Sequence, residues 1–184
     1  MRKLIYAINL TVDGCCDHTK VVVPDEKLYG YYTQLVQGAD MFVYGRKTYE
    51  LMVPYWPDIA RSHSGSKMEN DYADAFNAKK MVVFSQSREM AEDGNTRFTH
   101  ADLKEEILKL KQEEGGYILT GGVSIPEQLT QLGLIDEFRF VITPVIVGEG
   151  RRLFDDIQLQ ERLQLKLIES KVFDSGSVVL RYSK

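Results

Sequence analysis

The first third of the chain alternates between continuous apolar runs and apolar residues at helical spacing. The run Lys3 to Leu10 is almost entirely apolar, which is typical of a strand covered on both faces. A helix capped by Asp25 and stopped by Gly38 is expected because apolar residues recur between them: Leu28, Tyr32, Leu35 and Val36. A second buried strand is expected over Met41-Phe42-Val43-Tyr44-Gly45.

The next stretch is more polar, and its elements are expected to be short. Arg46 to Met52 should form a short helix that ends at Pro54-Tyr55-Trp56-Pro57, because two prolines cannot continue the hydrogen-bond ladder. The polar, serine-rich segment Asp58 to Lys67 is interpreted as a surface loop.

Two further strands are expected near the middle of the chain. A modest helix over Glu69 to Asn77 leads to a strand over Lys80 to Ser85. Asp93-Gly94-Asn95 is a turn signal, and a short strand is expected around Thr96 to Phe98.

Two later helices carry possible capping signatures. Asp102 precedes Glu105 by three residues, which is the spacing of a capping box at the start of a helix. The apolar face of this helix is Leu103, Ile107 and Leu110, and its solvated face is Lys104, Glu105, Lys109, Lys111 and Glu113. Ser124 and Glu127 have the same spacing and follow the apolar run Tyr117 to Thr120. The apolar side of this second helix is Leu129 and Leu132, and Gly133 is expected to end it.

The C-terminal third predicts antiparallel strands. A long strand is expected over Glu137 to Val147, with Pro144 demoting its later part to an edge or a bend. Leu163 to Phe173 and Ser177 to Tyr182 alternate and are joined by Asp174-Ser175-Gly176, which indicates a hairpin. The order of elements therefore predicts an α/β fold: a mixed, mostly parallel sheet with helices on both faces and a C-terminal antiparallel hairpin.

Composition narrows the functional classes. The 184 residues fit one domain spanning 1–184, and 43% hydrophobic with 27% charged residues is ordinary for a globular protein. A net charge of -4 argues against a broad nucleic-acid surface. Because the sequence shows no signal peptide and no apolar run of roughly 18 residues, we expect a cytoplasmic protein without a membrane partner.

Metal and disulfide chemistry are not expected from the sequence. The two cysteines, Cys15 and Cys16, are neighbours, so they cannot link distant parts of the fold. The three histidines, His18, His63 and His100, are widely scattered and show no zinc spacing. We therefore assign no metal and interpret the cysteines as loop residues.

The candidate chemistry lies where strands end on small or polar residues. Gly121 and Gly122 follow a strand and precede a helix, a combination that suits phosphate, although a tight turn alone also explains it. The other two strand ends carry Gly45-Arg46-Lys47-Thr48 and Ser85-Gln86-Ser87-Arg88. In an open α/β sheet such ends meet at one crevice, and these residues supply the cations and hydroxyls wanted around phosphates. For Arg46 and Lys47, a solvated first helical turn is the alternative.

These motifs together resemble a known family. Gly45-Arg46-Lys47-Thr48-Tyr49-Glu50 and Gly121-Gly122 with Glu127-Gln128-Leu129 are similar to signatures of dihydrofolate-reductase-like proteins. Val12-Asp13-Gly14 and Pro144 to Gly150 with Leu153-Phe154 resemble the branch that contains the reductase domain of riboflavin-biosynthesis deaminase-reductases. The resemblance covers nearly the whole chain and implies the three-layer dihydrofolate-reductase-like fold.

The resemblance also implies NADPH bound across the carboxyl edge of the sheet. Carried over to this sequence, Gly45, Arg46, Lys47 and Thr48 would hold phosphates, and Thr120 precedes the glycine pair at the third strand end. Ser85, Ser87 and Arg88 would lie near the adenosine 2′-phosphate. Gly121 and Gly122 would approach the pyrophosphate, and in the family a cis peptide joins them.

The substrate side is less explicit. A dihydrofolate reductase would place an acid in the first helix, but the matching stretch Lys27-Leu28-Tyr29-Gly30 has no carboxylate, and Asp25 is better explained as a helix cap. The resemblance implies that Asp13 lies beside the nicotinamide, as a catalytic or substrate contact, although a turn-forming Asp-Gly pair explains it equally well. Tyr55 and Trp56 are candidate walls for a planar substrate.

Three functions follow as hypotheses. The first is an NADPH-dependent reductase of a small heterocyclic or carbonyl compound, similar to the domain that reduces 5-amino-6-(5-phosphoribosylamino)uracil. The second is a non-catalytic NADP(H) or small-ligand binding protein of the same fold, and the third is an authentic dihydrofolate reductase. A homodimer is expected from the resemblance, with the C-terminal strands as a candidate interface.

Overall fold

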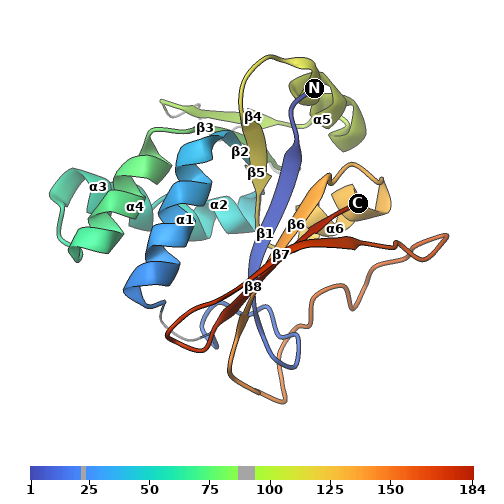
Figure 1. The fold of residues 1–184 in the computed structure, drawn as a ribbon. Coiled ribbons are helices and arrows are strands. Elements are labelled where there is room, and N and C mark those ends of the chain that lie inside the picture. The colour runs from blue at the N-terminus through green and yellow to red at the C-terminus, as the bar shows by residue number, and fades with distance from the viewer. Residues whose placement is uncertain (22–23, 87–93) are drawn as a thin grey trace.

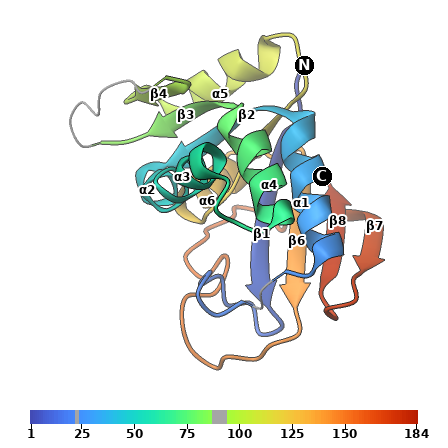
Figure 2. The same ribbon diagram turned by 90° about the vertical axis from the view of Figure 1, so that its left-hand side faces the viewer.

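A computed structural model describes residues 1–21, 24–86 and 94–184, and it shows one eight-stranded sheet between two layers of helices (Figures 1 and 2). The strands are β1 (Leu4–Thr11), β2 (Ala39–Gly45), β3 (Lys80–Phe84), β4 (Thr96–Thr99), β5 (Tyr117–Thr120), β6 (Glu137–Thr143), β7 (Lys166–Val172) and β8 (Val178–Ser183). Their order is β4-β3-β2-β5-β1-β6-β8-β7, and β8 pairs antiparallel with both of its neighbours. The predicted α/β sheet with its C-terminal hairpin is confirmed.

Six helices are present in the described part of the chain. They are α1 (Glu26–Gly38), α2 (Arg46–Met52), α3 (Tyr55–Ser62), α4 (Lys67–Asn77), α5 (Leu103–Gln112) and α6 (Ser124–Gln131). On one face of the sheet, Leu35 and Val36 of α1 and Phe76 of α4 join the buried residues of β2 and β3. On the other face, Ile107 of α5 and Leu129 of α6 are fully buried against β1 and β5. Helices therefore cover both faces, as the sequence predicts.

The parallel register brings strand ends to a common edge. β1 lies between β5 and β6, and β2 lies between β5 and β3, all running parallel. The carboxyl ends of β2, β3 and β5 are therefore neighbours, at Gly45, Phe84 and Thr120. This edge and the face of the sheet under α1 border the cavity described below.

The expected loop between Asp58 and Lys67 is largely helical, which corrects the sequence interpretation. Helix α3 runs from Tyr55 to Ser62, with Pro54 at its N-cap and Pro57 in its first turn. Proline is tolerated there because the first helical N–H groups have no intrahelical partner. The same residues that end α2 thus begin α3, and Ser66 with Glu69 then caps α4 by a complete capping box.

The second expected capping box does not form. Val123 is the N-cap of α6, so Ser124 is the first helical residue, and no side chain caps this end. Glu127 instead accepts hydrogen bonds from Arg151 at 2.7 Å and from the Phe154 N–H at 3.2 Å. Leu132, expected on the apolar side of this helix, is 42% exposed.

Lys111 was expected on the solvated face of α5 but is buried. Its ammonium donates to the Leu134 carbonyl at 3.1 Å and to Asp136 at 2.5 Å. A buried charge requires such partners, and they come from the segment between α6 and β6. The position of this segment is a tertiary property that the periodicity of α5 does not contain.

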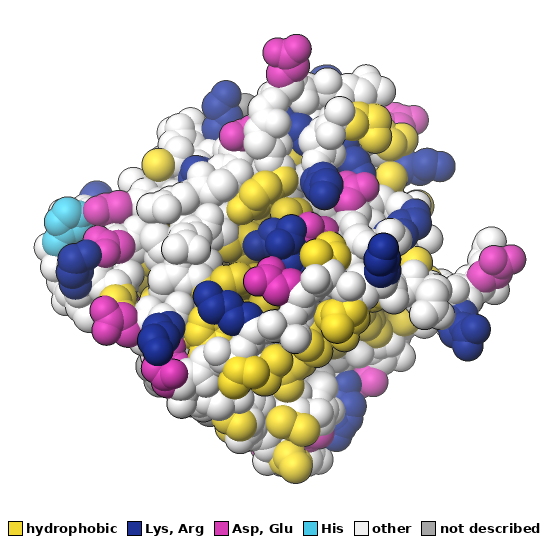
Figure 3. Space-filling model, viewed as in Figure 1, with side chains coloured by type: hydrophobic (Ala, Val, Ile, Leu, Met, Phe, Trp, Pro, Cys, Tyr) yellow, Lys and Arg dark blue, Asp and Glu magenta, His cyan; other side chains and the backbone are white. Residues whose placement is uncertain are grey.

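The C-terminal pair of strands leaves one sheet edge and part of one face uncovered. Every residue of β7 is exposed. Buried Glu137 on β6 binds Arg139 and Arg181, and Arg181 also contacts Glu169 of β7. Figure 3 shows charged side chains among apolar ones near the centre of this view. No described helix is long and apolar enough to cross a membrane.

Candidate functional site

A cavity of about 960 Å³ opens where β2, β3 and β5 end and extends beneath α1. Its volume lies at the upper end of the range for ligand pockets, which is roughly 300 to 1,000 Å³. Two parts differ in composition. We call them the strand-end half, lined by residues such as Gly45, Arg46, Lys47, Thr48, Ser85, Gly121, Gly122 and Ser124, and the aromatic chamber, lined by Asn9, Tyr29, Tyr31, Tyr32, Tyr44, Trp56, Tyr72 and Arg139.

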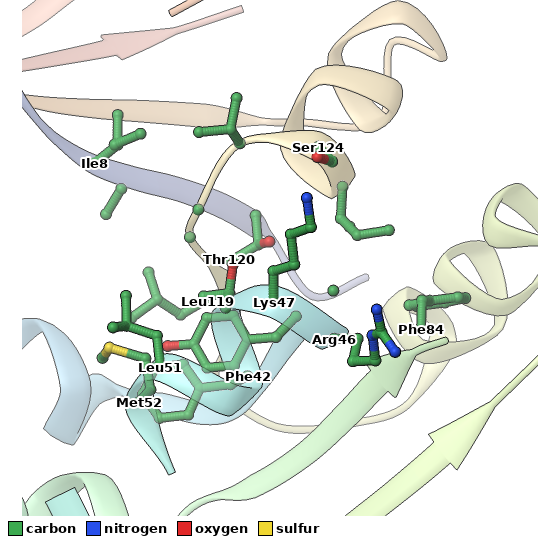
Figure 4. Close-up of a pocket in the computed structure, with 18 of the residues that line it drawn as sticks. Ile8, Phe42, Arg46, Lys47, Leu51, Met52, Phe84, Leu119, Thr120 and Ser124 are labelled. Atoms are coloured by element: carbon green, nitrogen blue, oxygen red, sulfur yellow. The ribbon is translucent and has the colours of Figure 1, made fainter. Parts of the chain in front are cut away.

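Exposed cations border the strand-end half. Arg46 and Lys47 begin α2 immediately after β2 and are solvent-exposed. In the close-up, Lys47 extends toward Ser124 at the start of α6, and Arg46 lies on the side of Phe84 (Figure 4). The structure therefore brings together two cations from one strand end and a helix N-terminus from another, an arrangement that suits a phosphorylated ligand.

The glycine pair closes the gap between β5 and α6. Gly122 has φ of +78°, and a Cβ there would overlap Thr48 Oγ1. Gly121 is less constrained, because the nearest atom to its Cβ position would be the Ala7 carbonyl oxygen at 3.4 Å. The peptide bond between these glycines is trans, so the cis geometry implied by the family resemblance is absent. Gly122 is required here by its backbone angle and by the close approach of α2.

The remaining residues predicted to bind the cofactor differ in where their side chains lie and what they contact. Ser85 follows β3, is buried and lines the cavity. The Thr120 hydroxyl donates to the Val43 carbonyl at 2.8 Å, so it links β5 to β2 within the cavity wall. Ser87 and Arg88, predicted near the 2′-phosphate, lie outside the described residues.

The aromatic chamber is formed by side chains from several elements. Trp56 of α3 packs against Tyr72 of α4, with ring centroids 4.5 Å apart. Trp56 lines the cavity as the sequence predicts, whereas Tyr55 packs on Trp56 from outside the lining and is 52% exposed. The sequence does not predict the tyrosines of α1 and α4 as site residues, because their spacing is equally typical of a core.

Asn9 and Tyr32 form a polar pair inside this chamber. The Tyr32 hydroxyl donates to Asn9 Oδ1 at 2.8 Å. Burial raises the pKa of the Tyr32 phenol, so this hydroxyl keeps its proton near neutral pH. Sequence reasoning missed Asn9, although an amide inside an otherwise apolar strand is a signal that could have identified it.

Arg139 is the charged residue of the chamber. Its Nε donates to Glu137 at 2.7 Å, and Arg181 donates to the same carboxylate oxygen at 2.7 Å. Burial opposes ionisation of Glu137, but the hydrogen bonds from the two arginines outweigh it and lower the pKa. Arg139 thus shares the buried carboxylate of Glu137 with Arg181, which also pairs with Glu169.

Asp13 is placed outside the cavity lining, which does not support a catalytic or substrate contact. Its carboxylate accepts hydrogen bonds from the Thr11 hydroxyl at 2.6 Å and from the N–H groups of Gly148 at 2.9 Å and Val147 at 3.3 Å. These bonds lower the pKa of Asp13 to about 2. Arg152 also contacts it at 3.5 Å. Asp13 therefore joins the loop after β1 to the loop after β6.

Two other sequence interpretations agree with the structure. Asp25 caps α1 by accepting from the Leu28 N–H at 2.8 Å, and it also accepts from the Ser175 N–H at 2.7 Å. It does not line the cavity. Burial raises the pKa of the Cys16 thiol, which is unfavourable for a nucleophile.

Metal coordination has no support in the described ranges. No group of three or more His, Cys, Asp or Glu side chains among those residues is arranged to hold a metal ion.

Comparison with protein families gives a match over nearly the whole chain. The family model described as "RibD C-terminal domain" matches residues 2–179. The uncharacterized protein YyaP of Bacillus subtilis (strain 168) is 31% identical over 98% of this chain and 94% of its own length. YwjB of the same organism is 28% identical over 73% of this chain and 70% of its own length.

Solved structures share the fold at low sequence identity. A putative riboflavin biosynthesis protein from Shewanella sp. PV-4 has a TM-score of 0.74 at 19% identity and covers 98% of both chains. A pyrimidine reductase-like protein from Corynebacterium diphtheriae has a TM-score of 0.66 at 15% identity, covering 99% of this chain and 91% of its own. A deaminase/5-amino-6-(5-phosphoribosylamino)uracil reductase from Thermotoga maritima has a TM-score of 0.70 at 16% identity, and the match spans 99% of this chain but 56% of that one.

Proposed function

This chain belongs to the RibD C-terminal domain family, and from that premise we propose that it is an NADPH-dependent reductase of a small heterocyclic or carbonyl compound. The observation that carries the proposal is one continuous cavity with a cationic strand-end half and an aromatic chamber. The phosphates of a dinucleotide need the cationic strand-end half, and a planar substrate beside the nicotinamide needs the aromatic chamber.

The residues of the strand-end half fit the cofactor. Arg46 and Lys47 offer charge for phosphate, and Ser124 offers a hydroxyl and a backbone N–H at the start of α6. Because Gly122 has no side chain, Thr48 of α2 can approach this turn closely. When bound, NADPH would supply the hydride, so the protein has to bind and orient both molecules and exclude water.

The chamber residues would orient the substrate. Trp56 and Tyr72 present aromatic surface for a planar ring, and Asn9 presents polar atoms at a fixed position. The resemblance implies that a dihydrofolate reductase needs an acid from the first helix facing its substrate. Here Asp25 caps α1 outside the cavity, so it does not take that position. This arrangement favours a substrate other than dihydrofolate.

Cofactor binding is the first test of the proposal. We expect NADPH to bind with an increase in nicotinamide fluorescence, and Lys47→Met to weaken that binding about tenfold through loss of one phosphate contact. Arg61→Gln is the matched control, because Arg61 is an exposed cation on α3 that does not line the cavity. Absence of NADPH binding at millimolar concentration would overturn the proposal.

A second candidate function is a binding protein without turnover. It is favoured by one observation: among the described residues that line the cavity, Asp102 is the only carboxylate, and its side chain caps α5. Stopped-flow oxidation of bound NADPH with a panel of cyclic carbonyl compounds separates the two functions. Hydride loss that depends on a compound identifies a reductase, and its absence across the panel favours the binding protein.

We also propose that two copies of the chain pair through β7. This edge strand exposes Leu167 by 52%, Ile168 by 46% and Val172 by 72%, together with its unpaired backbone. The neighbouring charges of Arg181 and Glu169 are self-complementary, as a twofold interface requires. Light scattering should give twice the chain mass, and Ile168→Lys should give the mass of one chain. A single-chain mass for the wild type would exclude the pairing.

A further inference from the structure

The Asn9 side chain has hydrogen-bonding capacity that the protein does not use. Asn9 Oδ1 accepts from Tyr32, but Nδ2 makes no hydrogen bond to any residue that the structure describes. The side chain is half-buried and lines the cavity. An amide carries two N–H donors, and leaving them unpaired on exclusion of water is costly. The position therefore suits a ligand that brings an acceptor.

The orientation of this amide follows from the strand and from α1. Ile5, Ala7 and Asn9 alternate onto the face of β1 that lies under α1, and Ile5 and Ala7 pack in the same apolar cluster as Leu35. Tyr32 reaches Asn9 from the helix. The Tyr32 hydroxyl donates to Asn9 Oδ1 at 2.8 Å, so this contact uses one acceptor position of the amide and neither of its N–H donors. The Nδ2 group is left for the ligand.

The charge around Asn9 defines what it can recognise. The described lining of the aromatic chamber contains no carboxylate, and Arg139 pairs with Glu137, which it shares with Arg181. A carboxylate would select a cationic edge such as an amidinium. Amide N–H groups instead bind an acceptor, such as a ring carbonyl oxygen, and offer no acceptor to a cationic edge.

We propose that Asn9 determines the specificity of the aromatic chamber by donating from Nδ2 to an uncharged acceptor on a planar substrate. Tyr32 acts as a positioning residue that fixes the amide. This inference rests on one part of the proposed function, namely that the aromatic chamber is where the substrate binds. It adds the residue that distinguishes neutral from cationic ligands.

Trp56 provides a direct measurement of binding in the chamber. It is the only tryptophan in the chain and it lines the cavity, so a planar ligand should quench its fluorescence without any turnover. The probes are quinazolin-4-one, which is neutral and carries a ring carbonyl, and 2,4-diaminoquinazoline. At about pH 6 the diamine is protonated and an aspartate is ionised.

The decisive variant is Asn9→Asp, which keeps the shape of the side chain and an acceptor for Tyr32. We expect the wild type to bind quinazolin-4-one about tenfold more tightly than the diamine, and Asn9→Asp to reverse that order by a similar factor. Asn77→Asp adds the same charge on an exposed residue outside the cavity and should leave the order unchanged. Tyr32→Phe should weaken quinazolin-4-one binding about threefold without reversing the order.

Two results would overturn the inference: no quenching of wild-type Trp56 by quinazolin-4-one, or an unchanged order of affinity in Asn9→Asp. NADPH binding is measured separately through nicotinamide fluorescence. If NADPH fails to bind while the Asn9→Asp reversal holds, the proposed reductase function fails and the role of Asn9 stands. If NADPH binds and the reversal is absent, the role of Asn9 fails alone.

Discussion

The two parts of the cavity are built in different ways. The strand-end half uses backbone turns and exposed side chains from short contiguous motifs, such as Gly45 to Thr48 and Thr120 to Gly122. The aromatic chamber uses single, half-buried side chains from several elements, including Asn9 of β1, Tyr32 of α1 and Trp56 of α3. One part is set by local sequence and the other by packing.

This difference suggests how the molecule divides its tasks. Conformational requirements such as the φ of +78° at Gly122 leave little freedom to vary the strand-end half. Side chains that line the chamber, by contrast, can change without altering a backbone turn. We therefore expect substitutions in the strand-end half to affect cofactor affinity and those in the chamber to affect the choice of ligand.

The largest effect should come from Gly122→Ala. The added Cβ would overlap Thr48 Oγ1 and would force a left-handed backbone angle, at a cost on the order of 1 to 2 kcal/mol for the angle alone. We expect NADPH affinity to fall more than tenfold and the melting temperature to decrease. Fluorescence titration and thermal melting measure the two quantities.

Gly121→Ala is the matched control for that change, because the nearest atom to the new Cβ would be 3.4 Å away. It should cost much less affinity and stability than Gly122→Ala. Equal losses in the two variants would contradict the role assigned to the close approach between Gly122 and Thr48.

The next largest effect should come from the cations. Arg46→Gln should reduce NADPH affinity about tenfold, and the loss should shrink as salt is raised, since exposed charges are screened. The affinity of quinazolin-4-one for the chamber should stay within about twofold, because Arg46 belongs to the other half. A parallel loss for both ligands would show that the two halves do not act independently.

Asp13→Asn tests the contact between the loops after β1 and β6, which lies outside both parts of the cavity. The folded-state pKa of Asp13 is lowered to about 2 by the hydrogen bond from Thr11 and those from Gly148 and Val147. The ionised carboxylate therefore stabilises the fold above its unfolded pKa of about 3.9, and this stabilisation is lost as pH falls toward 2. Thermal melts should show the wild type exceeding Asp13→Asn at neutral pH and converging with it at the acidic end.

The same variant separates a structural from a catalytic role for Asp13. NADPH affinity should change by less than about twofold in Asp13→Asn, because Asp13 does not line the cavity. A large loss of turnover with unchanged stability would restore the catalytic assignment that the sequence motif implied.

The smallest effect on stability should come from Ser124→Ala. Ser124 is the first residue of α6 and does not cap the helix, so the free energy of unfolding should change by less than about 0.5 kcal/mol. NADPH affinity should still fall about threefold if the hydroxyl contacts the ligand. Asp25→Ala is the contrasting variant, because its carboxylate caps α1 and its loss should cost about 1 kcal/mol.

The sequence determined most of the fold and the outline of the strand-end half. Apolar runs and glycine stops placed the strands, because burial on both faces and chain reversal are local requirements that side-chain order records. The same pattern placed Gly45 and the glycine pair at strand ends. It also identified the cations beside them, although the residues beyond Gln86 on the third strand end are not described.

Local signals misled where two elements compete for the same residues. The prolines that end α2 also start α3, and Ser124 and Glu127 have capping-box spacing although Glu127 binds Arg151 and the Phe154 N–H. The local pattern therefore gave the wrong structure in both segments. A neighbouring helix uses the prolines, and distant residues bind the carboxylate of Glu127.

Only the tertiary structure decided the aromatic chamber and the placement of Asp13. Asn9 becomes a candidate ligand contact because Tyr32, on a different element, occupies its carbonyl oxygen. Asp13 lies outside the cavity lining, and its carboxylate accepts hydrogen bonds from the loop after β6. Periodicity records which face of an element is apolar, but it does not record which distant side chain will satisfy a polar group. That pairing depends on long-range contacts, and here it leaves Asn9 in the cavity lining and Asp13 outside it.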